Sequence, residues 1–534
     1  MAEAQREVDV VVVGAGFAGL YMLHKLRQQG LAVQVFEAGD GVGGTWYWNR
    51  YPGARCDIES MEYSYGFDEE LQQEWEWTER YAPQPEILSY ANHVADRFDL
   101  RRDIQLETKV TAATFDEGTR TWQVGTDRGD EVTARFVIMA TGCLSAANTP
   151  AIPGADSFEG PTYHTGTWPH EGVDFTGQRV GVIGTGSSAI QSIPIIAEQA
   201  TELTVFQRTA TFTVPAWNQP LDPVAVKEIK AEYAEFRAEN RLMPSAFGAR
   251  MERTDRSAHE VTDEERREEF ERRWANGGLG FLGAYNDLLL DKAANDLAAE
   301  FVREKLREVV EDPELVRKLT PDQVVGCKRL CVDTGYWATF NQDHVHLVDL
   351  RETPIEAITP TGIRTTAGEH ELDAIVYATG FDAMTGALQR IDIRGRGGRT
   401  LQEAWSAGPR TYLGLGVEGF PNLFTITGPG SPSVLTNMLV SIQQHVEWIA
   451  DCIAYLDEQG LATIEASLDA QDAWVDFVNS VAGFTLFPTC NSWYLGANVP
   501  GKTRVFMPLP GFPTYVEQCE KVAEDGYSGF VLAG

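Results

Sequence analysis

Val8-Asp9-Val10-Val11-Val12-Val13-Gly14-Ala15-Gly16-Phe17-Ala18-Gly19 is a mostly apolar run that ends in a glycine fingerprint. Leucines recur with helical spacing over residues 20–26, so the stretch predicts a strand, a glycine turn and a helix. A second strand, 33–36, ends at Glu37, where such a fold places an acid for a ribose hydroxyl. Because glycines let the backbone approach a pyrophosphate at the helix N-terminus, we expect this unit to bind a dinucleotide.

A second fingerprint repeats the pattern further along the chain. Strand 180–183 leads into Gly184-Thr185-Gly186-Ser187-Ser188-Ala189 and then a helix. After the next strand, 203–206, the place of the acid is taken by Gln207, followed by Arg208. Loss of the acid removes repulsion, and an arginine can pair bidentately with a phosphate. The second unit therefore predicts NADPH rather than NADH; the alternative is a solvated surface arginine.

Two matched motifs flank the second fingerprint. Ala140-Thr141-Gly142 follows strand 132–139, and Ala378-Thr379-Gly380 follows strand 374–377. Small residues after a strand let the chain pass close to a cofactor or to another domain. The matched pair therefore predicts the two places where the chain crosses between an outer domain and an inserted one.

The fold class expected is α/β, with two nested Rossmann-like dinucleotide-binding domains and a helical insertion. Residues 1–150 and 383–534 would form the outer domain, and residues 151–220 and 321–382 the inserted one. Residues 221–320 carry helical apolar spacing between charged side chains, which predicts a helical cover over the second nucleotide fold.

Composition narrows the partners and the compartment. With 44 basic and 78 acidic residues the net charge is −34, which argues against nucleic acid or an anionic membrane as partner. We expect no secretory signal and no membrane span. The seven cysteines are scattered without metal spacing, so we expect free thiols, no metal and a cytoplasmic location.

Two longer patterns carry a family resemblance. Phe158, Gly160, His164, Trp168 and Pro169 match FxGxxxHxxxWP, and residues 43–57 match GGxWxxxxYPGxxxD at every fixed position. Taken alone, the first pattern is an ordered irregular connection and the second an aromatic loop, too irregular for a helix or a strand. Together, between two glycine fingerprints, they resemble the signatures of type I Baeyer–Villiger monooxygenases, and most of all the phenylacetone and steroid monooxygenase branch.

The resemblance implies FAD and NADPH as cofactors and a ketone and O2 as substrates. One oxygen atom would be inserted beside the carbonyl through a C4a-peroxyflavin, giving an ester or a lactone. Arg329 would stabilise the developing anion because a guanidinium stays protonated. Asp57 would orient Arg329, and Lys328 would reach the NADPH 2′-phosphate with Arg208. His164 would be a linker between domains rather than a base; a purely structural histidine is the alternative.

The same resemblance assigns the remaining site residues. FAD is expected to contact Gly14, Gly16, Ala18, Gly19, Glu37, Thr45, Trp46, Tyr47, Trp48, Asp57, Tyr63, Val110 and Met438. NADP is expected to contact Arg55, Thr185, Gly186, Ser187, Ser188, Gln191, Gln207, Arg208, Lys328 and Trp493. Val434 and Leu435 would border the substrate; they and Trp337 depart from the usual family residues, which leaves the ketone undecided.

Two other functions remain open. A flavin monooxygenase acting on nitrogen or sulfur shares the glycine motifs but normally lacks Trp168-Pro169. An electron-transfer or redox-sensing flavoprotein would oxidise NADPH without an organic product. Disulfide reductases are excluded because the loop after Gly43 holds only Cys56. For the oligomeric state we expect a monomer or a weak homo-oligomer.

Overall fold

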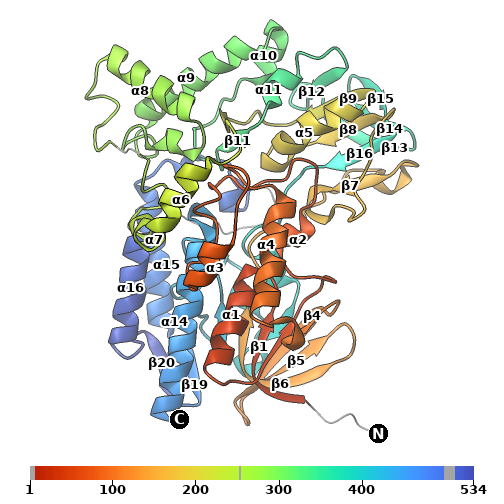
Figure 1. Ribbon diagram of the computed structural model, residues 1–534. Coiled ribbons are helices and arrows are strands. Elements are labelled where there is room, and N and C mark those ends of the chain that lie inside the picture. The colour runs from red at the N-terminus through yellow and green to blue at the C-terminus, as the bar shows by residue number, and fades with distance from the viewer. Residues whose placement is uncertain (1–5, 252–253, 498–510) are drawn as a thin grey trace.

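The first sheet is built on the first fingerprint. The computed structural model describes residues 6–251, 254–497 and 511–534 (Figure 1). Its largest sheet has the order β17-β4-β5-β6-β1-β2-β3, with β18 beside β6, and β1 is parallel to both its neighbours. The strands are β1 (Arg6–Val13), β2 (Val33–Phe36), β3 (Ile104–Gln105), β4 (Val110–Asp116), β5 (Thr121–Thr126), β6 (Glu131–Met139), β17 (Asp392–Arg394) and β18 (Leu423–Thr425).

Helices from both ends of the chain cover this sheet. α1 (Phe17–Gln28) follows the glycine turn and packs against α14 (Met438–Gln459), so red and blue segments lie side by side in Figure 1. Their buried faces share one hydrophobic core. The other elements around it are α2 (Thr45–Trp48), α3 (Glu69–Glu74), α4 (Gln84–Arg97), α15 (Leu468–Gly483), α16 (Phe512–Glu524), β19 (Thr463–Ala466) and β20 (Phe530–Ala533).

The second sheet is parallel throughout, in the order β12-β9-β8-β16-β7. Its edge strand β7 is contributed by the FxGxxxHxxxWP segment, which therefore extends the second nucleotide fold. The elements are β7 (Thr162–His164), β8 (Arg179–Ile183), α5 (Ser187–Gln199), β9 (Glu202–Gln207), β12 (Val345–Asp349), β16 (Ala374–Tyr377) and a small antiparallel sheet of β13 (Ile355–Thr359), β14 (Gly362–Thr365) and β15 (Gly368–Glu371).

The helical region divides between the two cores. Phe270, Phe281 and Phe301 pack together and belong to the core of the second sheet. Tyr233 and Phe236 belong to the first core instead, so these helices touch both folds. The remaining elements are α6 (Pro223–Ala231), α7 (Tyr233–Arg241), α8 (Asp263–Asn276), α9 (Lys292–Val309), α10 (Pro313–Leu319), β10 (Thr213–Pro215), β11 (Cys331–Asp333), α11 (Tyr336–Thr339), α12 (Gly386–Gln389) and α13 (Leu401–Ala404).

The two short crossings lie next to each other. The Asn148 N–H donates to the Gly380 carbonyl at 2.9 Å, and the Thr379 hydroxyl donates to the Asn148 carbonyl at 2.5 Å. Ala147 and Phe381 form an isolated bridge beside them. The chain thus leaves the first fold and returns to it at one place.

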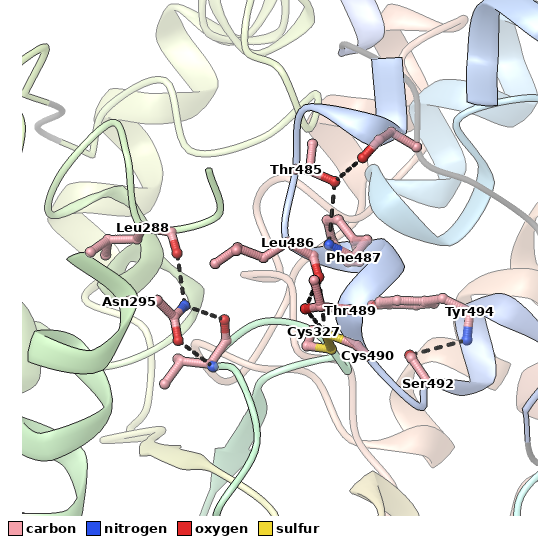
Figure 2. The surroundings of a disulfide bond; sticks show 12 residues. Leu288, Asn295, Cys327, Thr485, Leu486, Phe487, Thr489, Cys490, Ser492 and Tyr494 are labelled. Carbon is pink, nitrogen blue, oxygen red and sulfur yellow. Dashed lines mark hydrogen bonds between the residues drawn. A yellow bond between two sulfur atoms is a disulfide. The ribbon is translucent and has the colours of Figure 1, made fainter. Parts of the chain in front are cut away.

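Two expectations from sequence are wrong. Residues 45–48 of the aromatic loop form the short helix α2, because the turn after Gly44 lets Asn49 close an i to i+4 bond to Thr45. Cys327 and Cys490 form a disulfide and are not free thiols (Figure 2). The two cysteines are 163 residues apart in the sequence, and only the fold brings their Cα atoms to 6.1 Å. The sequence alone therefore did not indicate that they pair.

The disulfide joins two loops that other contacts also hold. The Asn295 side chain on α9 donates to the Val325 carbonyl and accepts from its N–H, both at 3.0 Å, and donates to Leu288 (Figure 2). The Leu486 N–H donates to the Leu289 carbonyl at 2.8 Å. The five other cysteines are buried and free. Within the part of the chain that is described, no helix is both long and apolar enough to cross a membrane.

Candidate active site

One large cavity receives both glycine turns. Its volume of about 1490 Å³ exceeds the roughly 300–1,000 Å³ of a typical single-ligand pocket. Most of the residues proposed from sequence line it: Gly14, Gly16, Ala18, Glu37, Thr45, Trp46, Trp48, Arg55, Asp57, Tyr63, Val110, Thr185, Gly186, Ser187, Ser188, Gln191, Arg208, Lys328, Arg329, Val434, Met438 and Trp493. Of the residues expected to contact a cofactor or to border the substrate, Gly19, Tyr47, Gln207 and Leu435 do not line it.

The first turn is shaped by close backbone approach. Gly14 has a φ of +104°, and a Cβ there would lie 2.6 Å from the Ala140 carbonyl oxygen. Glu37 is buried and accepts from the N–H groups of Ala15 at 2.7 Å and Gly39 at 2.8 Å. Burial raises the pKa of Glu37, although these backbone bonds oppose the shift. Each oxygen keeps a second lone pair, which a ribose hydroxyl could use.

The second turn repeats this geometry with different side chains. Gly184 has a φ of +116°, and a Cβ there would lie 2.3 Å from the Ala378 carbonyl oxygen. Gln207 points out of the cavity and donates to the Lys318 carbonyl at 2.7 Å. Arg208 and Lys328 face the cavity together, and burial and then the charge of Arg208 lower the pKa of Lys328. Two cations that face the same cavity could bind a doubly charged phosphate.

The aromatic loop spans the two turns. Trp46 and Tyr63 both line the cavity. The Trp46 indole N–H donates to the Tyr63 hydroxyl at 3.1 Å, which fixes the two side chains relative to each other. Tyr47 turns away and donates to Asp40 at 2.6 Å. From the same loop, Tyr51 donates to the Gln191 side chain on α5 at 2.8 Å. The loop therefore connects the first fold to the helix of the second.

Arg329 is held at the wall of the cavity by three hydrogen bonds. Its Nε and Nη2 donate to the two carboxylate oxygens of Asp57 at 2.7 and 2.8 Å. Its Nη1 donates to the Val434 carbonyl at 2.7 Å. Burial opposes the charge, but the carboxylate of Asp57 outweighs it and raises the pKa of Arg329 above its ordinary value. A fixed positive charge therefore faces the space between the two turns.

These features suit two dinucleotides. The first glycine of each turn, Gly14 or Gly184, lies against an alanine carbonyl with no room for a side chain, and each turn opens on the cavity at a helix N-terminus. The lining offers hydrogen-bonding, aromatic and cationic groups, the kinds of group that could bind a flavin dinucleotide and a phosphorylated nicotinamide dinucleotide. Among the described residues no group of His, Cys, Asp or Glu could hold a metal ion.

Comparisons with known proteins agree with the geometry. Residues 11–281 match the family model described as pyridine nucleotide-disulphide oxidoreductase. A Baeyer–Villiger monooxygenase of Pseudooceanicola batsensis is 44% identical, over 98% of this chain and 96% of that protein. A steroid monooxygenase structure bound to NADP superposes with a TM-score of 0.94 at 57% identity, covering 99% of each chain. The chain belongs to the Baeyer–Villiger monooxygenases. A phenazine N-monooxygenase of Lysobacter antibioticus is also 42% identical over 98% of this chain and 97% of that protein.

This Baeyer–Villiger monooxygenase is an NADPH-dependent flavoprotein that carries FAD. It inserts one oxygen atom of O2 next to a ketone carbonyl and forms an ester or a lactone. The family resemblance expected from the two signature patterns is confirmed, and so is the α/β fold class.

In this monooxygenase the fixed residues of the FxGxxxHxxxWP pattern do not line the cavity, although Gly166 and Thr167 between them do. His164 accepts from the Gly166 N–H at 2.9 Å and lies 3.3 Å from the Thr379 hydroxyl, in the returning crossing. Burial lowers the pKa of His164. Trp168 packs against Tyr163 and Phe175. These contacts suit a link between the crossings and the second fold rather than proton transfer.

An apolar cluster borders Arg329. It contains Cys143, Ala383, Met384, Val434, Phe487 and Tyr494, with Leu435, Met438 and Trp493 packed against it. Leu435 therefore supports the cavity from behind, whereas Val434 faces it. The family resemblance indicated this border at Val434 and Leu435, but nothing in the sequence indicated that the Val434 carbonyl binds Arg329. The bond between Tyr51 and Gln191 was also missed, because long-range pairs have no local signal.

Proposed function

We propose that Arg329 is the catalytic cation of this monooxygenase and that Asp57 holds it in place. The observation that carries this is the two-point pairing of Arg329 with Asp57 at a cavity reached by both glycine turns. When bound, FAD and NADPH supply the electrons and the activation of oxygen. The protein's part is to keep a guanidinium N–H donor beside the reacting carbonyl, where negative charge develops, and to exclude water.

We also propose a division of the binding residues between the cofactors. Glu37 would bind the adenosine ribose of FAD, and Trp46 and Tyr63 would wall its flavin. Arg208 and Lys328 would bind the 2′-phosphate of NADPH. The remaining assignments follow the lining of the cavity: Gly14, Gly16, Ala18, Thr45, Trp48, Val110 and Met438 for FAD, and Arg55, Thr185, Gly186, Ser187, Ser188, Gln191 and Trp493 for NADP.

The domain assignment stays a proposal as well. Residues 1–150 and 383–534 would bind FAD, residues 151–220 and 321–382 would bind NADPH, and residues 221–320 would be the helical insertion. The paired crossings at Asn148 and Gly380 support the first two boundaries. We further propose a cytoplasmic location and a monomeric or weakly associated state, which the net charge of −34 favours because like-charged molecules repel.

For the substrate we propose a ketone with a bulky apolar skeleton. The cluster around Val434, Met384 and Phe487 offers apolar contacts beside Arg329. The relatives include a steroid monooxygenase, an acetone monooxygenase and a cyclohexanone 1,2-monooxygenase, so the shared reaction does not fix the ketone. The phenazine N-monooxygenase relative makes nitrogen oxygenation the second candidate function.

The test measures NADPH consumption with and without phenylacetone, a steroid ketone, a cyclic ketone and phenazine, with products identified by mass. We expect a ketone to accelerate NADPH oxidation and to gain one oxygen atom. A product from phenazine alone would favour the second function, and hydrogen peroxide alone would contradict both.

Arg329→Ala should lower product formation at least about 100-fold while NADPH still reduces the flavin. Arg329→Lys should be nearly as poor, because an ammonium cannot make both bonds to Asp57. The matched control is Arg179→Ala, which removes a similar two-point pair with Asp373 on an exposed edge. Equal effects at both arginines would contradict the proposed role of Arg329.

A further inference from the structure

The turn between β18 and α14 carries the carbonyl that binds Arg329, and it is conformationally strained. Thr427 and Ser433 have φ values of +53° and +44°, in the left-handed region that side chains disfavour. Both residues are buried. Backbone strain of this kind persists only where surrounding contacts enforce it, and it clusters at functional sites.

Three hydrogen bonds, joined by short covalent segments of the turn, connect Arg329 to α14. The Val434 carbonyl accepts from Arg329 at 2.7 Å. The neighbouring Ser433 hydroxyl donates to the Thr427 carbonyl at 3.2 Å. The Thr427 N–H in turn donates to Nδ1 of His445, on α14, at 2.9 Å. His445 therefore holds the beginning of the turn by a hydrogen bond, and the end of the same turn accepts a hydrogen bond from Arg329.

The far side of His445 is also anchored. Because Nδ1 accepts a hydrogen bond, the neutral ring carries its proton on Nε2, which lies 2.9 Å from the Tyr515 hydroxyl. That hydroxyl donates to the Leu413 carbonyl at 2.8 Å. Both side chains are almost wholly buried, at 0% and 1% exposure. Every polar group of the pair is thus satisfied, and its orientation is fixed.

We propose that His445 and Tyr515 are positioning residues for the oxygenation, acting on Arg329 through the turn from Thr427 to Val434. The inference rests on the proposed role of Arg329. Asp57 fixes one edge of the guanidinium, and the Val434 carbonyl fixes Nη1 outside that edge. Arg329 comes from the inserted segment, whereas Asp57 and Val434 come from the outer one, so the turn sets where the cation docks. Small displacements of a reacting group are costly to rate.

The decisive variants are His445→Leu and His445→Gln. Leucine removes both bonds, whereas a glutamine amide can accept from the Thr427 N–H and donate to the Tyr515 hydroxyl. We expect His445→Leu to lower kcat for oxygenation, and the product formed per NADPH, about tenfold, the effect of roughly one lost hydrogen bond. KM for the ketone and flavin reduction should stay within about twofold. His445→Gln should recover most of the loss.

Ile449→Ala is the matched control. Ile449 is fully buried on the same helix, four residues further on, and it makes none of the hydrogen bonds described for the turn, so its truncation destabilises the core and leaves those bonds in place. We expect the thermal unfolding midpoint of the FAD-bound protein to fall in both His445→Leu and Ile449→Ala, and the coupling, which is the amount of product formed per NADPH, to fall only in the first. Equal coupling loss in Ile449→Ala would overturn the inference, since general instability would then explain it.

Two other substitutions remove different hydrogen bonds that connect His445 to the turn or hold His445 in place. Ser433→Ala removes the bond to Thr427, and Tyr515→Phe removes the anchor of His445; each should lower coupling about threefold. Combined with His445→Leu, Ser433→Ala should add nothing, because both interrupt the same set of hydrogen bonds. Additive losses would overturn the inference. If His445→Leu fails to fold, Ser433→Ala and Tyr515→Phe decide, and wild-type coupling in both would overturn it.

A structural readout separates this inference from the proposed function. A crystal structure of His445→Leu or Tyr515→Phe should show the Val434 carbonyl displaced from Arg329 and the Asp57 pair retained. An unmoved carbonyl would overturn the inference whatever the activity. If Arg329→Ala keeps full coupling, the proposed function fails instead, and the distance between Arg329 and Val434 still reports on positioning.

Discussion

Gly14 and Gly184 occupy equivalent places in the two nucleotide folds. Both have φ values between +100° and +120°, and both pass within 2.6 Å, measured from an added Cβ, of the carbonyl of an alanine in an Ala-Thr-Gly crossing. The folds differ one turn into the helix, where Gly19 corresponds to Ala189. A Cβ at Gly19 would lie 1.9 Å from the Gly14 carbonyl oxygen. The first helix therefore sits closer to its turn than the second.

A larger difference lies at the end of the second strand of each fold. Glu37 is turned inward and bound to the backbone of the first turn. Gln207 is turned outward to Lys318, and Arg208 faces the cavity in its place. We propose that the backbone of the turn provides a general phosphate site and that the residue after the strand selects the dinucleotide. Breaking each part separately tests this division.

The largest expected effect comes from the turn itself. Gly184→Ala should abolish NADPH binding, because the methyl group would strike the Ala378 carbonyl at an unfavourable φ. FAD should remain bound. Gly186→Ala offers the contrast, since no described atom lies within 4 Å of a Cβ there: it should fold normally and weaken NADPH binding only. Thermal unfolding and NADPH titration distinguish the two, and equal stability loss would contradict the comparison.

A smaller effect is expected for dinucleotide selection. Arg208→Ala should raise KM for NADPH about 30-fold, since a charge-assisted phosphate contact is worth about 2 kcal/mol. KM for NADH should change less than about twofold because NADH lacks the 2′-phosphate. Steady-state kinetics with both nucleotides measures this. The control is Arg317→Ala, an exposed arginine paired with Glu314 and Glu352, which should change neither constant.

The stability of the first fold should depend on pH through His445. Burial lowers the pKa of His445 to about 3, below the value near 6.5 of an unfolded chain, so the unfolded state binds the proton first. Stability from this group is full above pH 6.5 and falls as pH falls towards 3, by up to about 1.4 kcal/mol per pH unit. Between pH 6 and 4 the thermal midpoint of His445→Gln should fall less steeply than that of the wild type. Parallel curves would show that His445 titrates normally.

The smallest effect is expected at the residue that replaces Gly19 in the second fold. Ala189→Gly should cost about 1 kcal/mol of stability, the ordinary penalty of glycine within a helix, and leave NADPH affinity nearly unchanged. Gly19→Ala should instead prevent folding of the first unit or its FAD binding. Similar effects of the two substitutions would mean that the helices sit equally close to their turns.

Local patterns in the sequence correctly predicted the strands and the glycine turns of the two nucleotide folds. The strands at 33–36 and 374–377 have the bounds expected, and both fingerprints form turns between a strand and a helix. Wherever a contact joins distant segments, the residues gave no local signal: the disulfide of Cys327 with Cys490 and the bond of Arg329 to Val434 are examples. The pairing of Asp57 with Arg329 was expected only through the family resemblance. Side-chain direction was also hidden, as Gln207 and Tyr47 show by turning out of the cavity.

Because the two crossings are adjacent, the segment between them is inserted into the outer fold at one point. Because Asn148 and Gly380 are hydrogen-bonded neighbours, a few residues could span the gap left by removing the segment between them. Strands β6 and β18 of the outer fold would keep their pairing, since neither belongs to that segment. The second dinucleotide site could therefore be exchanged as a unit, by recombination in nature or by engineering, if the new segment also supplies the core contacts that Tyr233 and Phe236 make with the first fold.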